Sequence, residues 1–438
     1  KEEKSQKKKL AKQLAACRTE QGLSKASLEH YLKVCGKQFS KLLSSQQVQA
    51  EADRVWCGVE RCLFGNGKEL HFKKLMDFDT IGGKSNKNGA RFDLDAMYVN
   101  WLGLSLKCYL PKSENSLSYV WESLKGKISY CNIKRLMFSS GWRYYAEIVV
   151  SGDAPTRVLI GTSTMGIDPG VSTIAGVSED ACVLEELAPN AIQYEKKIQK
   201  ISQSMDRSRR ISNPNKYNED GTINRSNRDP WKYSKNYVKM CRLLKSLYRK
   251  KHAYIIDSHR ELCNKLITIA RYFPVEKMHF QALQKRAKET KRQEKKTEVK
   301  QKDGTVKVIQ KYKRKKRFGR SINRRAPARF LLELKRKAEA VGGVYAEVDT
   351  KEFKASQYNH VTDAYEKIPL SQREKEIGKR KVQRDLYSAF LIRNADLDFK
   401  HPDREKCEYE FEYFANLQDQ LILKMKESGL SMRQCFGF

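Results

Sequence analysis

The sequence lacks the patterns by which proteins enter or cross membranes. It has no apolar run of about 18 residues, no signal-peptide pattern and no lipidation motif. These absences argue against a membrane-spanning or lipid-anchored protein and predict a cytoplasmic one. The chain also begins at Lys1 rather than at a methionine, from which we expect a fragment of a longer protein.

Paired cysteines are lacking as well. The 11 cysteines are scattered along 438 residues, and no C-x-x-C motif occurs. An odd number of scattered cysteines in a long chain favours reduced thiols over a disulfide framework. Cys57 and Cys62 are the closest pair, but no two further residues are spaced to complete a zinc site. We therefore interpret both as packing residues.

Acidic residues are few relative to basic ones. The chain has 87 Lys/Arg against 52 Asp/Glu, which gives a net charge of +35. Such an excess predicts a polyanionic partner, because neutralising phosphates releases their bound counterions. An anionic membrane surface is the competing partner. Since membrane-directed patterns are absent, the charge favours a nucleic acid.

Hydrophobic periodicity divides the chain into regions of different character. Helical spacing is followed by strands with period-two alternation, and then by alternating strands and helices. We expect a helical domain over 1–55, an antiparallel β-barrel over 56–156 and an α/β domain over 157–438. Within the last domain we expect a helical insertion over 190–270 and a basic loop over 283–325. That loop has 19 Lys/Arg and 4 Asp/Glu; it is either a solvated flexible segment or a phosphate-binding one.

Asp168 is the most informative single residue. It lies in Met165-Gly166-Ile167-Asp168-Pro169-Gly170, between short predicted strands at 157–160 and 174–177. A tight turn there would expose one carboxylate at the edge of a sheet. In so basic a protein, this carboxylate is best explained as a Mg²⁺ ligand at a phosphodiester. The competing interpretation is an Asp that only shapes a β-turn.

An RNase H-like α/β fold needs carboxylates from distant parts of the chain. They stand on the first strand, at the end of a central strand and on a late helix, and together they hold two Mg²⁺ ions. Asp168 and Asp385 fit the first and last positions. The central residue should follow a predicted strand at 275–280, and Gln281 stands there.

Several stretches, in order, resemble the TnpB nucleases of insertion sequences and the related type V CRISPR effectors: 165–170, 204–231, 285–290, 316–327 and 384–389. The similarity covers 157–438; before that it is only architectural. It implies a RuvC nuclease lobe behind a recognition lobe, in which 1–55 is the helical recognition domain and 56–156 the wedge-type β-barrel, and it places the protein in a prokaryotic cytosol. It also implies a monomeric ribonucleoprotein in which a guide RNA selects the target DNA next to a short flanking motif.

The chain departs from this family in one catalytic position. The resemblance assigns the catalytic roles to Asp168, Gln281 and Asp385, with Asp168 and Asp385 as metal ligands, but the family has Glu where Gln281 stands. We therefore expect an impaired nuclease, either by an engineered exchange or in a natural branch that binds without cutting. Glu276 and Glu289 are the nearest alternative carboxylates, and neither fits the expected slot.

Many relatives carry a four-cysteine zinc ribbon before the third motif. The corresponding segment, 350–380, contains no cysteine, so we predict a target-loading segment without zinc. His360 within it is either a ligand, a catalytic helper or a hydrogen-bonding structural residue. The candidate nucleic-acid contacts, which the resemblance and the basic loop suggest together, are Arg207, Trp231, Lys285, Arg286, Lys313, Arg314, Arg320, Arg324 and Arg325.

Three functions remain open from the sequence. The first is an RNA-guided DNA endonuclease, here impaired at Gln281. The second is a guide-directed DNA-binding repressor with no catalysis. The third is a strand transferase or resolvase that uses the same fold without RNA. The lysine-rich loop and the predicted barrel favour the first two.

Overall fold

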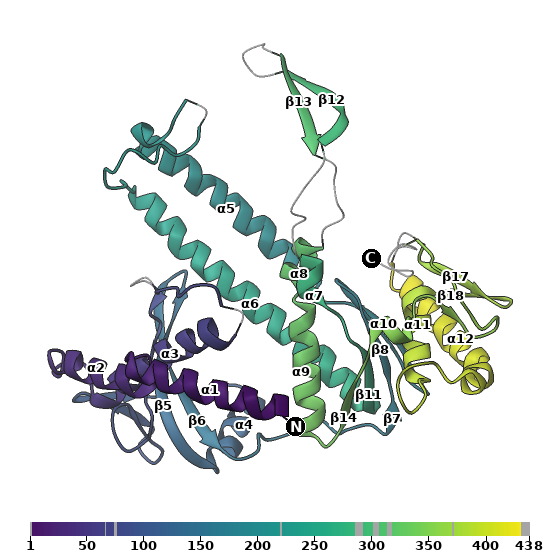
Figure 1. Ribbon diagram of the computed structural model, residues 1–438, viewed down its shortest axis with the longest axis horizontal. Helices are drawn as coiled ribbons and strands as arrows, with labels where there is room; N and C mark the ends of the chain where they lie inside the picture. Colours follow the sequence, from purple (N-terminus) through teal and green to yellow (C-terminus); the bar gives the residue numbers. More distant parts are fainter. Residues whose placement is uncertain are drawn as a thin grey trace. The chain divides into compact units, whose positions relative to one another are not determined.

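The computed structural model describes residues 2–65, 67–73, 77–219, 221–284, 292–300, 306–312, 318–369 and 372–430. The chain divides into two compact units, Lys1–Pro155 and Thr156–Phe438. Each unit is described by itself (Figure 1). No helix among the described residues is long and apolar enough to cross a membrane.

Unit 1 begins with the helices α1 (Glu2–Glu20), α2 (Lys25–Lys37) and α3 (Ser45–Phe64). Serine side chains cap the second and third helices. Ser44 and Gln47 form a reciprocal capping box at the start of α3, which satisfies backbone N–H groups that a helix leaves without partners. These helices bury little: α2 contains no buried residue, and α3 buries Gln47 and Ala52.

The rest of unit 1 is built on two separate sheets. One has the order β1-β5-β6, and the other β2-β3-β4. Their strands are β1 (Thr80–Ile81), β2 (Arg91–Asp93), β3 (Tyr98–Trp101), β4 (Leu104–Lys107), β5 (Lys127–Phe138) and β6 (Gly141–Ser151), with helix α4 (Glu114–Leu124) between β4 and β5. The described residues therefore show two three-stranded sheets where the sequence predicted a barrel. Their shared core contains Ala90, Phe92, Val99, Leu124 and Cys131.

Unit 2 is built on a mixed six-stranded sheet in the order β10-β9-β8-β11-β14, with β7 also paired to β11. The strands are β7 (Ser163–Thr164), β8 (Gly166–Pro169), β9 (Thr173–Val177), β10 (Cys182–Glu186), β11 (Ala270–Glu276) and β14 (Val344–Val348). The strands β8, β9 and β10 pair antiparallel, whereas β8, β11 and β14 are parallel. This mixed sheet with its helices confirms the predicted α/β class.

Two strand predictions in unit 2 were wrong. No strand forms at 157–160. The strand predicted over 275–280 instead runs from Ala270 to Glu276, and a short helix, α7 (Phe280–Gln284), follows it. The preceding residues Ile267 and Ala270 are buried in the core. Continuous burial across a helix–strand junction hides the boundary from periodicity alone.

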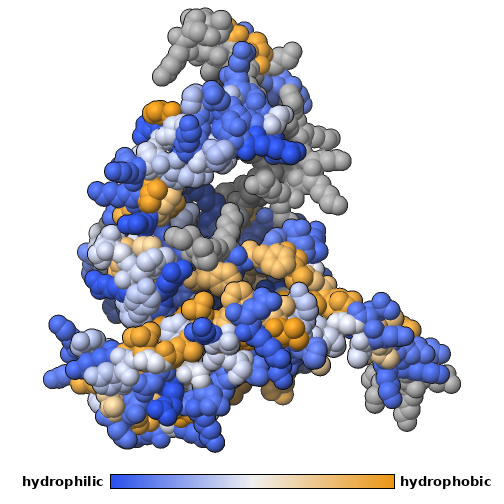
Figure 2. Space-filling view, turned by 90° about the vertical axis from the view of Figure 1, so that its left-hand side faces the viewer, coloured by the Kyte–Doolittle hydropathy of each residue, from blue (hydrophilic) through white to orange (hydrophobic). Residues whose placement is uncertain are grey.

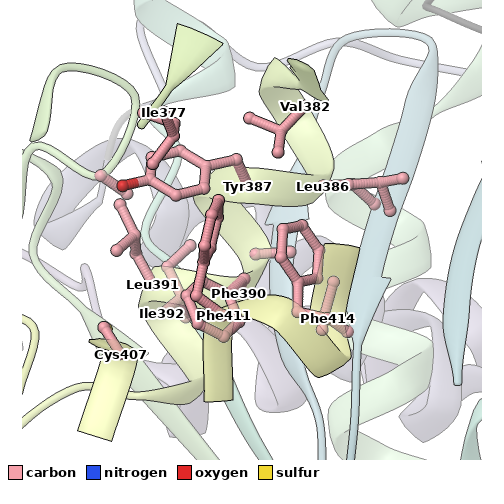
Figure 3. Packing of buried hydrophobic residues seen from close by; sticks show 14 of the residues in the cluster. Ile377, Val382, Leu386, Tyr387, Phe390, Leu391, Ile392, Cys407, Phe411 and Phe414 are labelled. Atoms are coloured by element: carbon pink, nitrogen blue, oxygen red, sulfur yellow. The ribbon is translucent and has the colours of Figure 1, made fainter. Parts of the chain in front are cut away.

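Helices cover both faces of the sheet. One face packs on α6 (Lys235–Ile269) and α9 (Pro327–Ala340) through a core that includes Ile167, Phe273, Leu266 and Phe330. The other packs on α11 (Arg384–Arg393) and α12 (Arg404–Glu427), where the rings of Phe390 and Phe414 stack with centroids 4.6 Å apart (Figure 3). The neighbours Val183 and Leu184 on β10 enter opposite cores, as the alternation of a strand requires.

The remaining elements of unit 2 project from this sandwich. The helix α5 (Ala191–Ser212) forms an antiparallel pair with α6, and the short 3-10 helix Pro214–Lys216 follows it (Figure 1). Within the predicted basic loop, the described residues form the hairpin β12 (Arg292–Lys300) and β13 (Val306–Tyr312), then α8 (Gly319–Arg325). The short elements before α11 are α10 (Thr350–Phe353), β15 (Tyr358–Asn359), β16 (Ala364–Tyr365), β17 (Glu374–Ile377) and β18 (Arg380–Gln383).

Candidate active site at three carboxylates

Asp168 and Glu276 lie on adjacent parallel strands at the same end of the sheet. Val275 of β11 is paired with Ile167 of β8, so the next residue on each strand is an acidic one. Glu276 is 9 % exposed, and Asp168 is only partly exposed. The pairing of two strands thus brings two carboxylates together from positions more than 100 residues apart.

Asp385 is supplied by the first turn of α11. This helix packs on β8 unusually closely, because Gly166 has no side chain. A Cβ at Gly166 would lie 2.1 Å from the carbonyl oxygen of Ala389 and 2.3 Å from the backbone nitrogen of Arg393. Gly166 precedes Asp168 by two residues, so the close approach fixes the helix over the strand that carries the first carboxylate.

The electrostatics show that the three carboxylates interact. Burial raises the pKa of Asp168 well above its usual range, and the charges of Glu276 and Asp385 raise it further. Burial also raises the pKa of Glu276, and Asp385 adds to the effect. Asp168 and Glu276 also share a hydrogen bond, which contributes to the coupling of their pKa values.

Asp385 is held differently, by positive charge. Its Oδ1 accepts hydrogen bonds from Nε and Nη2 of Arg384, at 3.0 and 2.8 Å. Its Oδ2 lies 3.4 Å from Nη1 of Arg373 and 3.4 Å from Nε2 of Gln383. Gln383 also caps α11, since its side-chain oxygen accepts a bond from the backbone N–H of Leu386.

Gln281 does not share this environment. It lies on α7, five residues beyond Glu276, and its side chain is exposed. Glu276 instead ends the central strand and interacts with both aspartates. From the sequence, Glu276 was an alternative that did not fit, because the strand was predicted to continue to residue 280. The useful signal was the apolar strand ending in an acidic residue, as in Ile167-Asp168.

The donor set fits a hard divalent cation. Carboxylate oxygens are the ligands that Mg²⁺ prefers, and a cation would relieve the mutual repulsion that raises these pKa values. Among the described residues, no three His, Cys, Asp or Glu side chains already encircle an ion position. Asp168 and Glu276 share a hydrogen bond, and Arg384 binds Asp385. The residue types and their mutual interaction fit a divalent cation.

Three predicted nucleic-acid contacts, Arg320, Arg324 and Arg325, lie on α8, and their side chains differ in exposure. Arg324 donates to Glu195 at 2.7 Å, and Arg325 pairs with Glu186. The two side chains are only 13 % and 12 % exposed, so both join α8 to neighbouring elements of unit 2. Arg320 is 77 % exposed and remains accessible to a phosphate.

The other predicted contacts have mixed outcomes. Trp231 is partly buried against Tyr217, with ring centroids 6.0 Å apart, and it lies under the charge of Lys216. Arg207 is exposed, and its guanidinium donates to Ser204 at 3.3 Å. The four basic residues of the loop, Lys285, Arg286, Lys313 and Arg314, lie outside the described residues.

The cysteine-free segment before α11 is held by a buried polar network. His360 is 1 % exposed, and its Nδ1 lies 2.8 Å from the hydroxyl of Tyr387. Lys375 donates to the backbone oxygen of Tyr358 at 2.6 Å, and its ammonium lies over the ring of Tyr387. Burial lowers the pKa of His360 to about 4, so the ring is neutral at pH 7. His360 is thus a packed, hydrogen-bonded residue.

Unit 1 contains a cavity of about 1400 Å³ with aromatic and basic side chains around an apolar floor. Tyr109 and Tyr144 are 87 % and 68 % exposed. The basic residues among its lining are Lys107, Lys112, Lys125 and Arg143. Exposed rings beside cations are the combination that binds unpaired nucleobases and their phosphates. Scattered apolar patches on a mainly hydrophilic surface are also visible in Figure 2.

Comparison with known proteins gives matches only among solved structures. No family model and no curated protein matches the chain. A structure of a Cas12f1–guide RNA–target DNA complex has a TM-score of 0.48 and 13 % identity, over 84 % of this chain and 75 % of that one. A CRISPR–Cas12f ternary complex has a TM-score of 0.30 and 14 % identity, over 87 % and 75 %. Both of these solved structures are complexes of Cas12f proteins.

Proposed function

We propose that the protein is a metal-dependent nuclease that hydrolyses phosphodiester bonds at Asp168, Glu276 and Asp385. The observation that carries this proposal is the convergence of three carboxylates on neighbouring elements of one mixed sheet. Two come from paired strands, and the third from a helix that packs closely on β8. The resulting elevated pKa of Asp168 is typical of functional sites.

Bound Mg²⁺ would generate the attacking hydroxide and stabilise the leaving oxygen. The chain's own contribution is to supply oxygen ligands in a fixed arrangement. Asp168 and Glu276 are held by strand pairing, and Asp385 is held by the helix start and by Arg384. Because burial and the nearby charges of Glu276 and Asp385 raise the pKa of Asp168, metal binding at this carboxylate would be coupled to loss of its proton.

This assignment replaces the hypothesis of an impaired site. With Glu276 as the third carboxylate, Gln281 is not required to be one. We therefore propose an active nuclease rather than an engineered or natural inactive form. The alternative of a repressor without catalysis predicts binding without cutting.

The nucleic-acid substrate follows from charge and resemblance. A net charge of +35 suits a nucleic-acid complex, and the RuvC-like motifs of unit 2 favour DNA selected by a guide RNA. The strand order, with three antiparallel strands followed by two parallel ones, supports the RNase H-like assignment. We propose a guide RNA and a target DNA as partners, Mg²⁺ as the cofactor and no structural zinc.

A paired cleavage assay tests the proposal. The protein would be purified with its RNA, that RNA sequenced, and a matched DNA target incubated with Mg²⁺. We expect cutting by the natural chain and by Gln281→Ala, and none by Glu276→Gln. Both substitutions are in adjacent elements, so the exposed Gln281 is a matched control for the buried carboxylate.

The opposite results would be equally clear. Binding without cutting by the natural chain would support the repressor. Cutting by Glu276→Gln, or cutting only after Gln281→Glu, would contradict the assignment of the third carboxylate.

A further inference from the structure

We infer that Arg384 is a positioning residue that fixes Asp385 through Oδ1 and directs Oδ2 towards the metal. This inference rests on the proposed function, since it concerns Asp385, one of the three carboxylates of that site. Arg384 is next to Asp385 in sequence, yet its side chain turns back to the carboxylate of its own neighbour. It therefore acts through Asp385 rather than on the substrate.

The two oxygens of Asp385 are bound unequally. The fork of Arg384 reaches Oδ1 at 3.0 and 2.8 Å, which is the range of strong, charge-assisted bonds. The contacts of Arg373 and Gln383 to Oδ2 are both 3.4 Å, near the limit of a hydrogen bond. Oδ2 is thus the oxygen that can exchange its partners for a cation at the smaller cost.

Arg384 is itself immobilised. Its side chain is 11 % exposed, and its Nη1 donates to the backbone oxygen of Gln372 at 3.2 Å. Its backbone N–H donates to the carbonyl of Arg373 at 2.9 Å. One bond ties the guanidinium, and the other the backbone of Arg384, to the segment just before β17. A carboxylate gripped by a fixed guanidinium keeps its orientation before the metal arrives.

The planar shape of the guanidinium matters as much as its charge. A lysine at this position would keep one positive charge but could not present two parallel N–H groups to one oxygen. Residues that orient a metal ligand typically change metal affinity about 10–100-fold when they are replaced. We expect Arg384→Lys to weaken metal binding by a factor in this range.

The test is a calorimetric titration of the full chain, freed of nucleic acid. Mn²⁺ replaces Mg²⁺ as the titrated metal. Arg380→Lys is the matched control, since Arg380 is on the hairpin β17–β18 and pairs with Glu412 and Asp419 instead. We expect about 10–100-fold weaker Mn²⁺ binding for Arg384→Lys and no change for Arg380→Lys. Thermal unfolding without metal should give similar midpoints for both variants.

A kinetic measurement separates positioning from a structural role. If Arg384 positions a ligand, more Mg²⁺ is needed for half-maximal cutting by Arg384→Lys, and saturating Mg²⁺ restores most of kcat. A merely structural role would lower kcat at every Mg²⁺ concentration. Should Arg384→Lys fail to fold, Arg384→Gln, which keeps a planar donor, takes its place in both measurements.

The outcomes distinguish the two proposals. Equal Mn²⁺ affinity of Arg384→Lys and the natural chain would overturn the positioning role and leave the proposed function intact. A kcat that stays low at saturating Mg²⁺ would do the same. No Mn²⁺ binding by the natural chain would overturn the proposed function itself, and the positioning role with it.

Discussion

Helices α2 and α11 are of similar length, but they are built in opposite ways. Nine of the ten residues of α11 are buried, whereas none of the thirteen residues of α2 is. In α2, Tyr31 and Val34 are 65 % and 55 % exposed. The helix that carries a carboxylate ligand is enclosed on all sides, and the helix of the proposed recognition region leaves its apolar side chains uncovered. A metal site needs side chains held in a fixed geometry, whereas a recognition surface needs side chains that a partner can reach.

The largest effect is expected from a substitution that disturbs the packing of α11 on β8. In Gly166→Ala, the new methyl group would overlap the backbone of α11, and α11 cannot move without disturbing the core that it shares with α12. We expect a loss of about 3 kcal/mol or more in unfolding free energy and no cutting. Gly58→Ala in α3 is the control, because its Cβ would meet only Leu70 at 3.4 Å. Urea unfolding compares the two, and equal stability of both variants would contradict the argument.

A second prediction sharpens the contrast between function and stability. Asp168→Asn should abolish cutting and yet raise the unfolding temperature of the metal-free protein at neutral pH. The folded-state pKa of Asp168 is raised, so its stabilising contribution is present below the unfolded pKa and is lost as pH rises through the folded one. Asn cannot lose a proton, so the variant lacks this decline.

Thermal unfolding in EDTA between about pH 4 and 8 measures this difference. This pH range includes both the ordinary carboxyl pKa and neutral pH. The natural chain and Asp168→Asn should diverge as pH increases. Mg²⁺ should then stabilise only the natural chain, because a ligand that binds the folded state raises its stability. Parallel curves in EDTA would show that the folded protein does not raise the pKa of Asp168.

A third prediction concerns the exposed aromatics of unit 1. If the cavity binds unpaired bases, Tyr109→Ala and Tyr144→Ala should each weaken binding of a single-stranded oligonucleotide by about 1–3 kcal/mol. Phenylalanine at either position keeps the ring and should keep most of the affinity. Fluorescence anisotropy at fixed salt checks this expectation. Losses of the same size in the phenylalanine variants would point to the hydroxyls instead.

The smallest expected effect separates two arginines of one helix. Arg320→Ala should reduce the salt dependence of nucleic-acid binding by a slope of about 1 without changing stability, because Arg320 is exposed. Arg324→Ala should instead lower stability by about 1–3 kcal/mol, since it leaves the partly buried Glu195 with fewer partners. Binding titrations at several salt concentrations and thermal unfolding measure the two. Reversed effects would refute the division of roles on α8.

The sequence analysis predicted the two aspartates of the proposed site but set aside its glutamate, Glu276. Asp168 and Asp385 are flagged by local patterns, namely an apolar strand before a Pro-Gly turn and a late apolar helix. Glu276 depends on the register between β8 and β11, which is a long-range pairing. The roles of Arg324 and Arg325 depend in the same way on Glu195 and Glu186, which lie on other elements. Local propensity contains no information about such partners.

The buried network around Lys375 also affects how the protein responds to oxidants. In a four-cysteine zinc ribbon, thiolates are both the metal ligands and the groups that peroxide attacks. Here an ammonium, a backbone carbonyl and a phenol hold the segment before α11, and residues 350–383 contain no thiol. Oxidising conditions that would unravel a thiolate-held ribbon leave these groups chemically unchanged. The contacts that hold the segment before Asp385 thus contain no thiol that an oxidant could attack.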